Sequence, residues 1–228
     1  MKYKALIICV IICYSNLSLF AQNRNDRFHE FGSNRALQIK GYFGPLISLS
    51  NVEGSFAMDA GATSGLVIND KFFIGIYGQK LITKVPRTDL TILGYPTYTD
   101  GLIKMVHGGG VLGYIHHTNK SVNWGISGSG GVGRVKLLAV PPTFQLGENI
   151  YDDLIIIVIP RLFVETNMTP WLKINVSGGY RFIGMMNGAY DNPSGVRIST
   201  FNHVDYDKPE FSFSLLFGSF GFHSYLLK

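Results

Sequence analysis

Apolar residues recur at every second position in eight segments of the chain, and turn-forming residues separate these segments. A period of two is typical of β-strands whose two faces meet different surroundings. The segments are 37–48, 56–68, 72–84, 102–116, 122–140, 154–166, 172–186 and 210–222. None of them shows a helical repeat, so the pattern predicts an all-β protein with eight strands.

The connections between these segments alternate in length. The short connections are 69–71, 117–121 and 167–171, and the long ones are 85–101, 141–153 and 187–209, after an intermediate first connection at 49–55. Outer-membrane barrels have short periplasmic turns and longer outside loops. With the N-terminus on the periplasmic side, every long connection falls outside. We therefore expect an eight-stranded antiparallel up-and-down transmembrane β-barrel.

The two faces of the segments differ in polarity. In 172–185, large apolar residues such as Val176 and Phe182 occupy the even positions, whereas Lys173 and Arg181 occupy odd ones. Because an eight-stranded barrel has an interior just wide enough for side chains, the polar face should point inward and form a paired network. The residues expected in this interior polar network are Lys40, Asp59, Gln79, His107, Arg161, Glu165, Lys173 and Arg181. A wide solute channel is not expected.

The short turns predict strand registers and a belt of aromatic side chains. Centring them on Asp70, Asn119 and Thr169 pairs Ile68 with Phe72, Tyr114 with Trp124, and Glu165 with Lys173. Amphipathic rings are favoured where hydrocarbon meets headgroups. The aromatic residues expected at the membrane interface beside these turns are Trp124, Trp171, Tyr114 and Phe72. A second belt is expected near the long loops, at Tyr95, Tyr98, Phe144, Tyr151, Tyr190 and Tyr206.

The run 154–159 is apolar at both odd and even positions. A strand buried on both faces of a soluble sandwich would have this pattern. The same run could instead line a dry upper part of the barrel lumen. The alternation alone leaves both interpretations open.

The first 21 residues have the features of a secretory signal peptide. Lys2 and Lys4 precede a short apolar core, and cleavage is expected after Ala21. A polar tail should then occupy 22–35, and the barrel 36–228. Both cysteines, Cys9 and Cys13, lie in the leader, so the mature chain should have no thiol chemistry.

Composition narrows the function classes. Charged residues make up 15% of the chain, below the roughly 25% of soluble domains. The formal charge of +5 includes the two leader lysines, and the other basic residues form no run, so nucleic acid is not an expected partner. Low charge with 27 glycines and 13% aromatic residues instead fits a barrel that faces lipid.

Candidate chemistry is sparse. His116 and His117 are adjacent, so on a strand they point to opposite faces and do not form a metal site. The glycine-rich stretch 128–133 lacks the Lys-Ser/Thr pair of a phosphate-binding loop. Polar residues that could form a catalytic triad share the last long loop: Asp191, Ser194, Ser199, His203, Asp205 and Asp207. We expect no catalytic residues, no metal and no cofactor.

Three segments and the leader ending in Phe20-Ala21-Gln22 resemble small outer-membrane barrels of the OmpX and OmpA-transmembrane type. These segments are 41–45 (GYFGP), 72–78 (FFIGIYG) and 211–217 (FSFSLLF). The resemblance covers nearly the whole mature chain and implies an outer-membrane protein of a Gram-negative-type cell envelope. Outer-membrane lipid, lipopolysaccharide and the barrel-assembly machinery are the implied partners, together with an unidentified surface or envelope protein.

The expected function is therefore a non-catalytic outer-membrane barrel with an envelope-structural or surface-interaction role through its long loops. Two alternatives remain open. One is a lipid-modifying enzyme of the lipid A deacylase or acyltransferase type, using loop residues. The other is a soluble, lipocalin-like barrel that binds an apolar ligand, which the doubly apolar run 154–159 favours.

Overall fold

The described part of the chain forms one closed β-barrel. The computed structural model describes residues 37–87, 101–116, 122–139, 149–185, 190–191, 197–198 and 206–220. The predicted signal peptide (1–21) and polar tail (22–35) lie outside these residues. Among the residues described, no helix is long and apolar enough to cross a bilayer.

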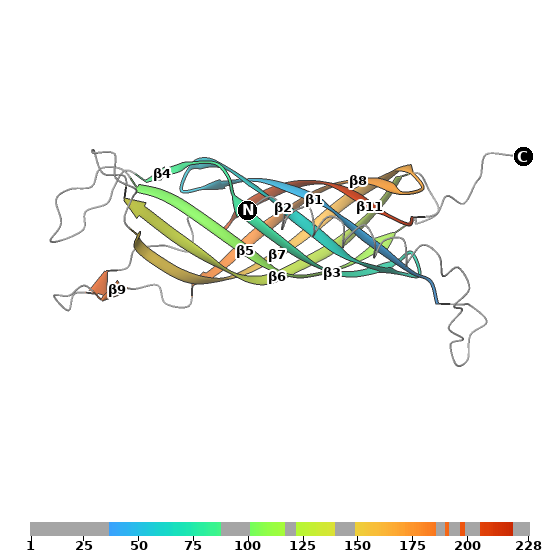
Figure 1. Cartoon of the computed structure of the whole chain (residues 1–228), viewed down its shortest axis with the longest axis horizontal. Helices are drawn as coiled ribbons and strands as arrows, with labels where there is room; N and C mark the ends of the chain where they lie inside the picture. Colours follow the sequence, from blue (N-terminus) through green and yellow to red (C-terminus); the bar gives the residue numbers. More distant parts are fainter. Residues whose placement is uncertain are drawn as a thin grey trace, which may run out of the picture. The chain divides into compact units, whose positions relative to one another are not determined.

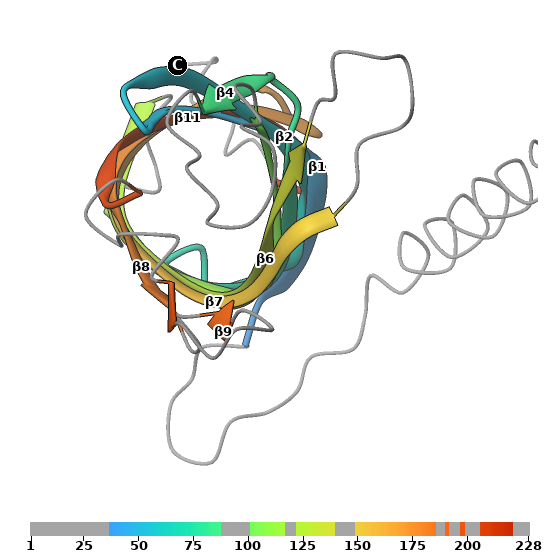
Figure 2. The same cartoon turned by 90° about the vertical axis from the view of Figure 1, so that its left-hand side faces the viewer.

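Eight long antiparallel strands make the wall. They are β1 (Ile39–Val52), β2 (Ser55–Ile68), β3 (Phe72–Leu81), β5 (Gly101–His116), β6 (Val122–Ala139), β7 (Asn149–Thr169), β8 (Leu172–Met185) and β11 (Lys208–Gly218). Their order is β3-β2-β1-β11-β8-β7-β6-β5, and β3 pairs with β5 to close the ring (Figures 1 and 2). The structure confirms the predicted all-β, eight-stranded, antiparallel up-and-down barrel.

Three short strands lie at the end that carries the long connections, and none of them was predicted. β4 (Val85–Arg87) extends the sheet beside β5, and β9 (Tyr190–Asp191) pairs with β10 (Arg197–Ile198) within the last long connection. We call this end of the barrel the loop end, and the opposite end, where β1 begins, the turn end.

The strands alternate between an inward and an outward face, as the sequence pattern requires. Along β1, the even positions Tyr42, Gly44, Leu46, Ser48 and Ser50 are buried, and the odd positions between them are exposed. The exposed positions include large apolar side chains such as Phe43, so many hydrophobic residues of this wall face away from the protein's own centre.

The first connection is shorter than predicted. Instead of an intermediate loop at 49–55, β1 and β2 are joined by a two-residue turn. Glu53 and Gly54 have φ angles of 49° and 78°. Positive φ at both central residues is the type I′ geometry that matches the twist of a hairpin. One of the four connections at the loop end is therefore a tight turn.

Two of the three predicted hairpin registers are shifted. Ile68 pairs with Phe72 as predicted, but Tyr114 lies opposite Ile126, and Glu165 opposite Asn175. Both shifts move the partner by two residues. A two-residue slip keeps every side chain on its own face, so hydrophobic alternation does not distinguish the two registers.

Candidate functional site

The side chains inside the barrel form successive layers, which can be followed along β7 from the loop end. Ile155, Ile157 and Ile159 come first, then Arg161, and then Glu165, all pointing inward. The layers are an apolar plug, a central ion network, and a partly polar cavity towards the turn end.

The apolar plug fills the lumen at the loop end. It comprises Val52, Ala57, Leu81, Val85, Ile103, Met105, Val135, Ile155, Ile157, Ile159, Ile183 and Tyr206. Leu154, Ile156 and Val158 alternate with the plug isoleucines and face outward, at 39–51% exposure. The run 154–159 is thus apolar on both faces because one face lines a dry lumen and the other belongs to the outer surface.

Tyr206 departs from the expected second aromatic belt. It is fully buried in the plug, and its hydroxyl donates to Glu53 Oε1 at 3.1 Å. It therefore lies over the lumen beside the tight β1–β2 turn rather than on the outer surface. The expected belt residues Tyr95, Tyr98 and Phe144 lie outside the described residues.

The central ion network consists of Asp59, Arg161, Arg181 and Glu210. Arg181 Nη1 lies 3.2 Å from Asp59 Oδ2 and 3.8 Å from Glu210 Oε2, and Arg161 Nη2 lies 2.7 Å from Glu210 Oε1. Asp59, Arg181 and Glu210 are essentially inaccessible to solvent. Two cations meet two anions, so the buried layer carries no net charge, which limits its desolvation penalty.

Serine hydroxyls accept further hydrogen bonds from the two guanidinium groups. Arg181 Nη2 donates to Ser50 at 2.9 Å, and Arg161 Nη1 donates to Ser129 at 2.6 Å. Gln79, also in this layer, donates to Ser48 at 2.7 Å. Arg161 reaches across β8 to Glu210 on β11, and Arg181 reaches past two strands to Asp59 on β2. These contacts therefore cross the lumen rather than following one strand pair.

Glu210 is missing from the sequence-based set of interior residues, although it is the acid that joins both arginines. The signal was present, since Glu210 alternates with Ser212 and Ser214 on the polar face of its strand. Its position near the start of the strand, next to Pro209, gave no indication of its depth in the lumen.

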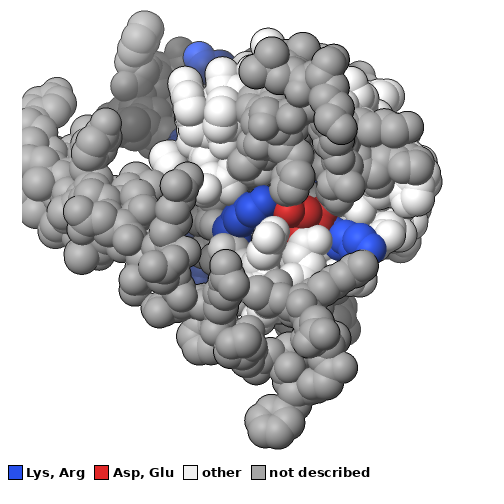
Figure 3. All heavy atoms as spheres, turned by 90° about the vertical axis from the view of Figure 1, so that its right-hand side faces the viewer, with Lys and Arg blue, Asp and Glu red and all other residues white. Residues whose placement is uncertain are grey.

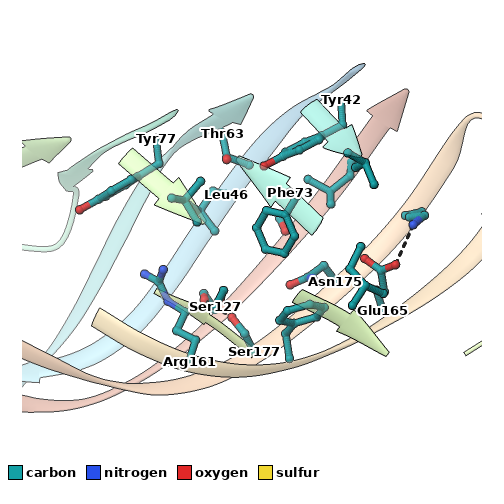
Figure 4. A pocket seen from close by; sticks show the side chains of 18 of the residues that line it. Tyr42, Leu46, Thr63, Phe73, Tyr77, Ser127, Arg161, Glu165, Asn175 and Ser177 are labelled. Atoms are coloured by element: carbon teal, nitrogen blue, oxygen red, sulfur yellow. Dashed lines mark hydrogen bonds and ion pairs between the residues drawn. The ribbon is translucent and has the colours of Figure 1, made fainter. Parts of the chain in front are cut away.

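Nearer the turn end lies a second ion pair beside a small cavity. Lys173 Nζ lies 2.7 Å from Glu165 Oε1, with both side chains buried, and 4.6 Å from the centre of the Phe220 ring. The cavity has a volume of about 80 Å³, and Tyr42, Tyr77 and Arg161 are among the side chains around it (Figure 4). This volume suits a few water molecules, since one water needs about 10–15 Å³.

The remaining predicted interior residues lie in or beside these layers. His107 is 4% exposed, and its ring meets that of Tyr77 edge-on with centroids 5.6 Å apart. Lys40 is only partly buried and pairs with Asp70 at 2.7 Å at the turn end. Figure 3 views this end, where basic and acidic side chains lie side by side.

At two glycines of the wall, the backbone of the neighbouring strand lies too close to leave room for a side chain. A Cβ added to Gly109 would lie 2.1 Å from the carbonyl oxygen of Gly130, and one added to Gly61 would lie 1.9 Å from that of Gly78. Neither position can take a side chain without moving the backbone, so glycine is required at both.

The expected interface aromatics lie on the outer surface beside the short turns. Phe72, Trp124 and Trp171 are 50–56% exposed. Phe72 contacts Tyr114 with ring centroids 5.2 Å apart, and Trp171 stacks on Phe217 at 6.2 Å. These contacts join neighbouring strands into an aromatic band around part of the turn end.

The candidate catalytic residues of the last loop are not assembled by the part of the chain that the structure describes. Asp207 has a structural role: its Oδ1 accepts from the Ile183 N–H at 2.6 Å, and its carbonyl accepts from the Tyr180 hydroxyl at 2.9 Å. Asp191 belongs to β9, whereas Ser194, Ser199, His203 and Asp205 lie outside the described residues. Within the described ranges, no group of three or more His, Cys, Asp and Glu side chains could hold a metal ion.

Comparison with known proteins supports the fold. No protein-family model matches the sequence, and no curated protein matches it. A major outer membrane protein from Thermus thermophilus matches with a TM-score of 0.51 and 10% identity, over 78% of this chain and 98% of that one. Neisserial surface protein A matches at a TM-score of 0.49 and 11% identity, over 82% and 100% of the two chains. Ail, the attachment invasion locus protein of Yersinia pestis, matches at 0.40 and 13%, over 79% and 95%.

At 10% identity, the match to the Thermus protein establishes the fold alone. The chain has the architecture of a small outer-membrane β-barrel.

Proposed function

We propose that this chain is a non-catalytic barrel of the outer membrane whose long loops have an envelope-structural or surface-binding role. One observation carries the proposal: charged side chains are buried inside the barrel and large apolar side chains are exposed on its outside, the reverse of a soluble protein. Arg181, Asp59 and Glu210 are buried at its centre, whereas residues such as Leu162 and Ile76 are 65% and 68% exposed. Exposed apolar area on this scale marks a surface that meets lipid or a partner.

The height of the apolar surface fits a bilayer. On β6 the outward positions from Val122 to Val132 carry no charge, and Arg134 follows. Ten steps of about 3.4 Å along a strand tilted by about 40° span about 26 Å. The outward apolar band of outer-membrane barrels is about 25 Å tall.

The filled lumen supports a role other than conduction. The apolar plug closes the loop end, and the paired ions of the central network occupy the middle. Solutes would have to displace both layers. The same packing argues against a lumen ligand of the lipocalin kind, because the cavity has room for only a few water molecules.

Fractionation combined with gel mobility tests the membrane assignment. We expect the protein in the outer-membrane fraction, extractable only with detergent, and migrating differently before and after boiling. Recovery from the soluble periplasm without detergent would contradict the proposal and favour a soluble barrel. In planar bilayers, we expect no steady channel conductance; a large, stable conductance would contradict the sealed lumen.

A separate measurement tests the non-catalytic assignment. Lipid A from cells with and without the gene should give the same mass spectrum. A change in acyl-chain number that depends on the gene would instead establish a lipid-modifying enzyme. Alanine at His203 and Asp205 would then show whether these loop residues are responsible.

A further inference from the structure

Outward-facing cations gather on one side of the barrel near the loop end. Lys80 on β3 and Lys104 on β5 are exposed, and on β6 the side chains of Arg134 and Lys136 are 62% and 35% exposed. We call these four residues the basic patch. β3, β5 and β6 are consecutive in the wall (Figure 1).

The strand registers place the four cations in two neighbouring rows. Lys80 pairs with Val106, which pairs with Arg134, and Lys104 lies directly opposite Lys136. Like charges directly opposite each other on a sheet are destabilising. An anion that lies over the cations would relieve this repulsion.

Within the described ranges, one carboxylate is paired with the basic patch. Asp152 lies 2.9 Å from Lys136 and 3.7 Å from Arg134. Lys80 and Lys104 have no ion-pair partner among the residues that the structure describes. Four cations and one carboxylate give these five described residues a net charge of about +3.

The basic patch lies at the border of the apolar surface and on one side only. Val106 lies between Lys80 and Arg134, and Val132 lies in the next outward row towards the turn end; they are 50% and 57% exposed. The outward positions described on β1, β2, β8 and β11 include no Lys, Arg, Asp or Glu. A ring of charges that merely kept the barrel end hydrated would not be confined to three adjacent strands.

Several outward positions between the basic patch and the turn end are glycines. A Cβ added to Gly78, Gly128 or Gly130 would meet no heavy atom within 4 Å, so packing within the chain does not require glycine there. Ile76 and Leu112, on the same outward face, are 68% and 66% exposed. Because the glycines place no side chain on this part of the outer face, an acyl chain can lie against it, while recognition depends on the cations above.

We propose that the basic patch binds the phosphate groups of an anionic lipid in the leaflet at the loop end, with an acyl chain lying over the glycines. This inference rests on the proposed function, because the patch meets lipid headgroups only if the barrel spans the membrane. Charge complementarity selects the phosphate, and the position at the border of the apolar surface selects a lipid rather than a soluble anion.

Native mass spectrometry of the folded, full-length barrel in detergent tests the proposal. The probes are diphosphoryl lipid A, phosphatidylcholine and inorganic phosphate. The test variant is Lys80→Gln/Lys104→Gln. The matched control is Lys40→Gln/Lys71→Gln, which removes the same charge at the turn end. Heat-modifiable mobility shows that each variant is folded.

We expect the wild type to retain lipid A and to release phosphatidylcholine. The test variant should bind lipid A about 30-fold more weakly, at roughly a factor of five per lysine near a charged lipid surface. The control variant should bind as the wild type does. Equal binding by the test variant, or an equal loss in both variants, would overturn the proposal.

Competition by inorganic phosphate at concentrations similar to those of lipid A would also overturn it, because the site would then recognise a soluble anion.

The lipid site and the membrane assignment can fail separately. A heat-modifiable, detergent-dependent barrel that retains no lipid A would refute the lipid site and leave the membrane assignment intact. A protein that is soluble without detergent would refute the membrane assignment itself.

Discussion

Replacing Arg181 with methionine removes the charge at the centre of the lumen while keeping a side chain of similar length. Arg181 is fully buried and is the only ion-pair partner of Asp59 among the described residues. Glu210 keeps its 2.7 Å contact with Arg161. The substitution therefore leaves one buried carboxylate, that of Asp59, without a counter-charge.

The expected cost follows from that uncompensated charge. Removing one partner of a buried ion pair typically costs about 3–5 kcal/mol. Removing both partners restores neutrality, so Asp59→Asn/Arg181→Met should be less destabilised than the sum of the two single variants. We expect a coupling free energy of about 1–3 kcal/mol, the upper part of the range for residues in contact.

Urea unfolding of the barrel in lipid vesicles, followed by heat-modifiable mobility and by tryptophan fluorescence, measures these free energies. Lys40→Met is the matched control, because its pair with Asp70 is partly exposed, with side-chain accessibilities of 21% and 32%, and should contribute about 1 kcal/mol or less. The reasoning is refuted if Arg181→Met unfolds within about 1 kcal/mol of the wild type. Strict additivity in the double variant would refute it as well.

Three further predictions use the same unfolding assay. Leu162→Arg should cost about 2–4 kcal/mol if this 65% exposed side chain faces the bilayer centre; a change within about 0.5 kcal/mol would indicate a water-facing surface. Gly61→Ala should destabilise by about 1–3 kcal/mol or more because its Cβ would collide with a backbone carbonyl, and Gly128→Ala, with open space, should be nearly neutral; equal effects would contradict this. Tyr206→Phe should cost about 1 kcal/mol for the lost hydrogen bond to Glu53, and Tyr206→Ala about 3–5 kcal/mol for the emptied plug; similar losses in both variants would contradict the packing role.

Alternation between two environments made the fold and the two faces predictable. Because the outer surface and the lumen of the barrel differ in polarity, the parity of positions such as Lys173 and Phe182 could be assigned from the sequence alone. Parity does not determine how far along the barrel axis a residue lies, however. The predicted registers at two of the short turns were therefore wrong by two residues. The Glu165–Lys173 ion pair forms all the same, because long side chains reach diagonal neighbours.

Contacts across the lumen could not be predicted in this way. The contact between Asp59 and Arg181 depends on the order of the strands, their tilt and the positions of both residues along the barrel axis. The alternation of polar and apolar residues gives no information on any of these. The tight turn at Glu53 and Gly54 was missed for a related reason, since the polar residues around it are compatible with a longer loop. The basic patch was also missed, because its members come from three strands and only the registers place them in two rows.

The bonds across the lumen have a consequence for assembly. Arg161 and Glu210 are 49 residues apart along the chain, and Arg181 and Asp59 are 122 apart. Glu210 lies on β11, the last strand of the barrel. Before β11 is added, a partly assembled barrel would contain two arginines, Arg161 and Arg181, and only one carboxylate of this network, that of Asp59. On the proposed membrane assignment, insertion into the bilayer and closure of the barrel should then occur in a single concerted step, because an incomplete intermediate would carry unbalanced charge.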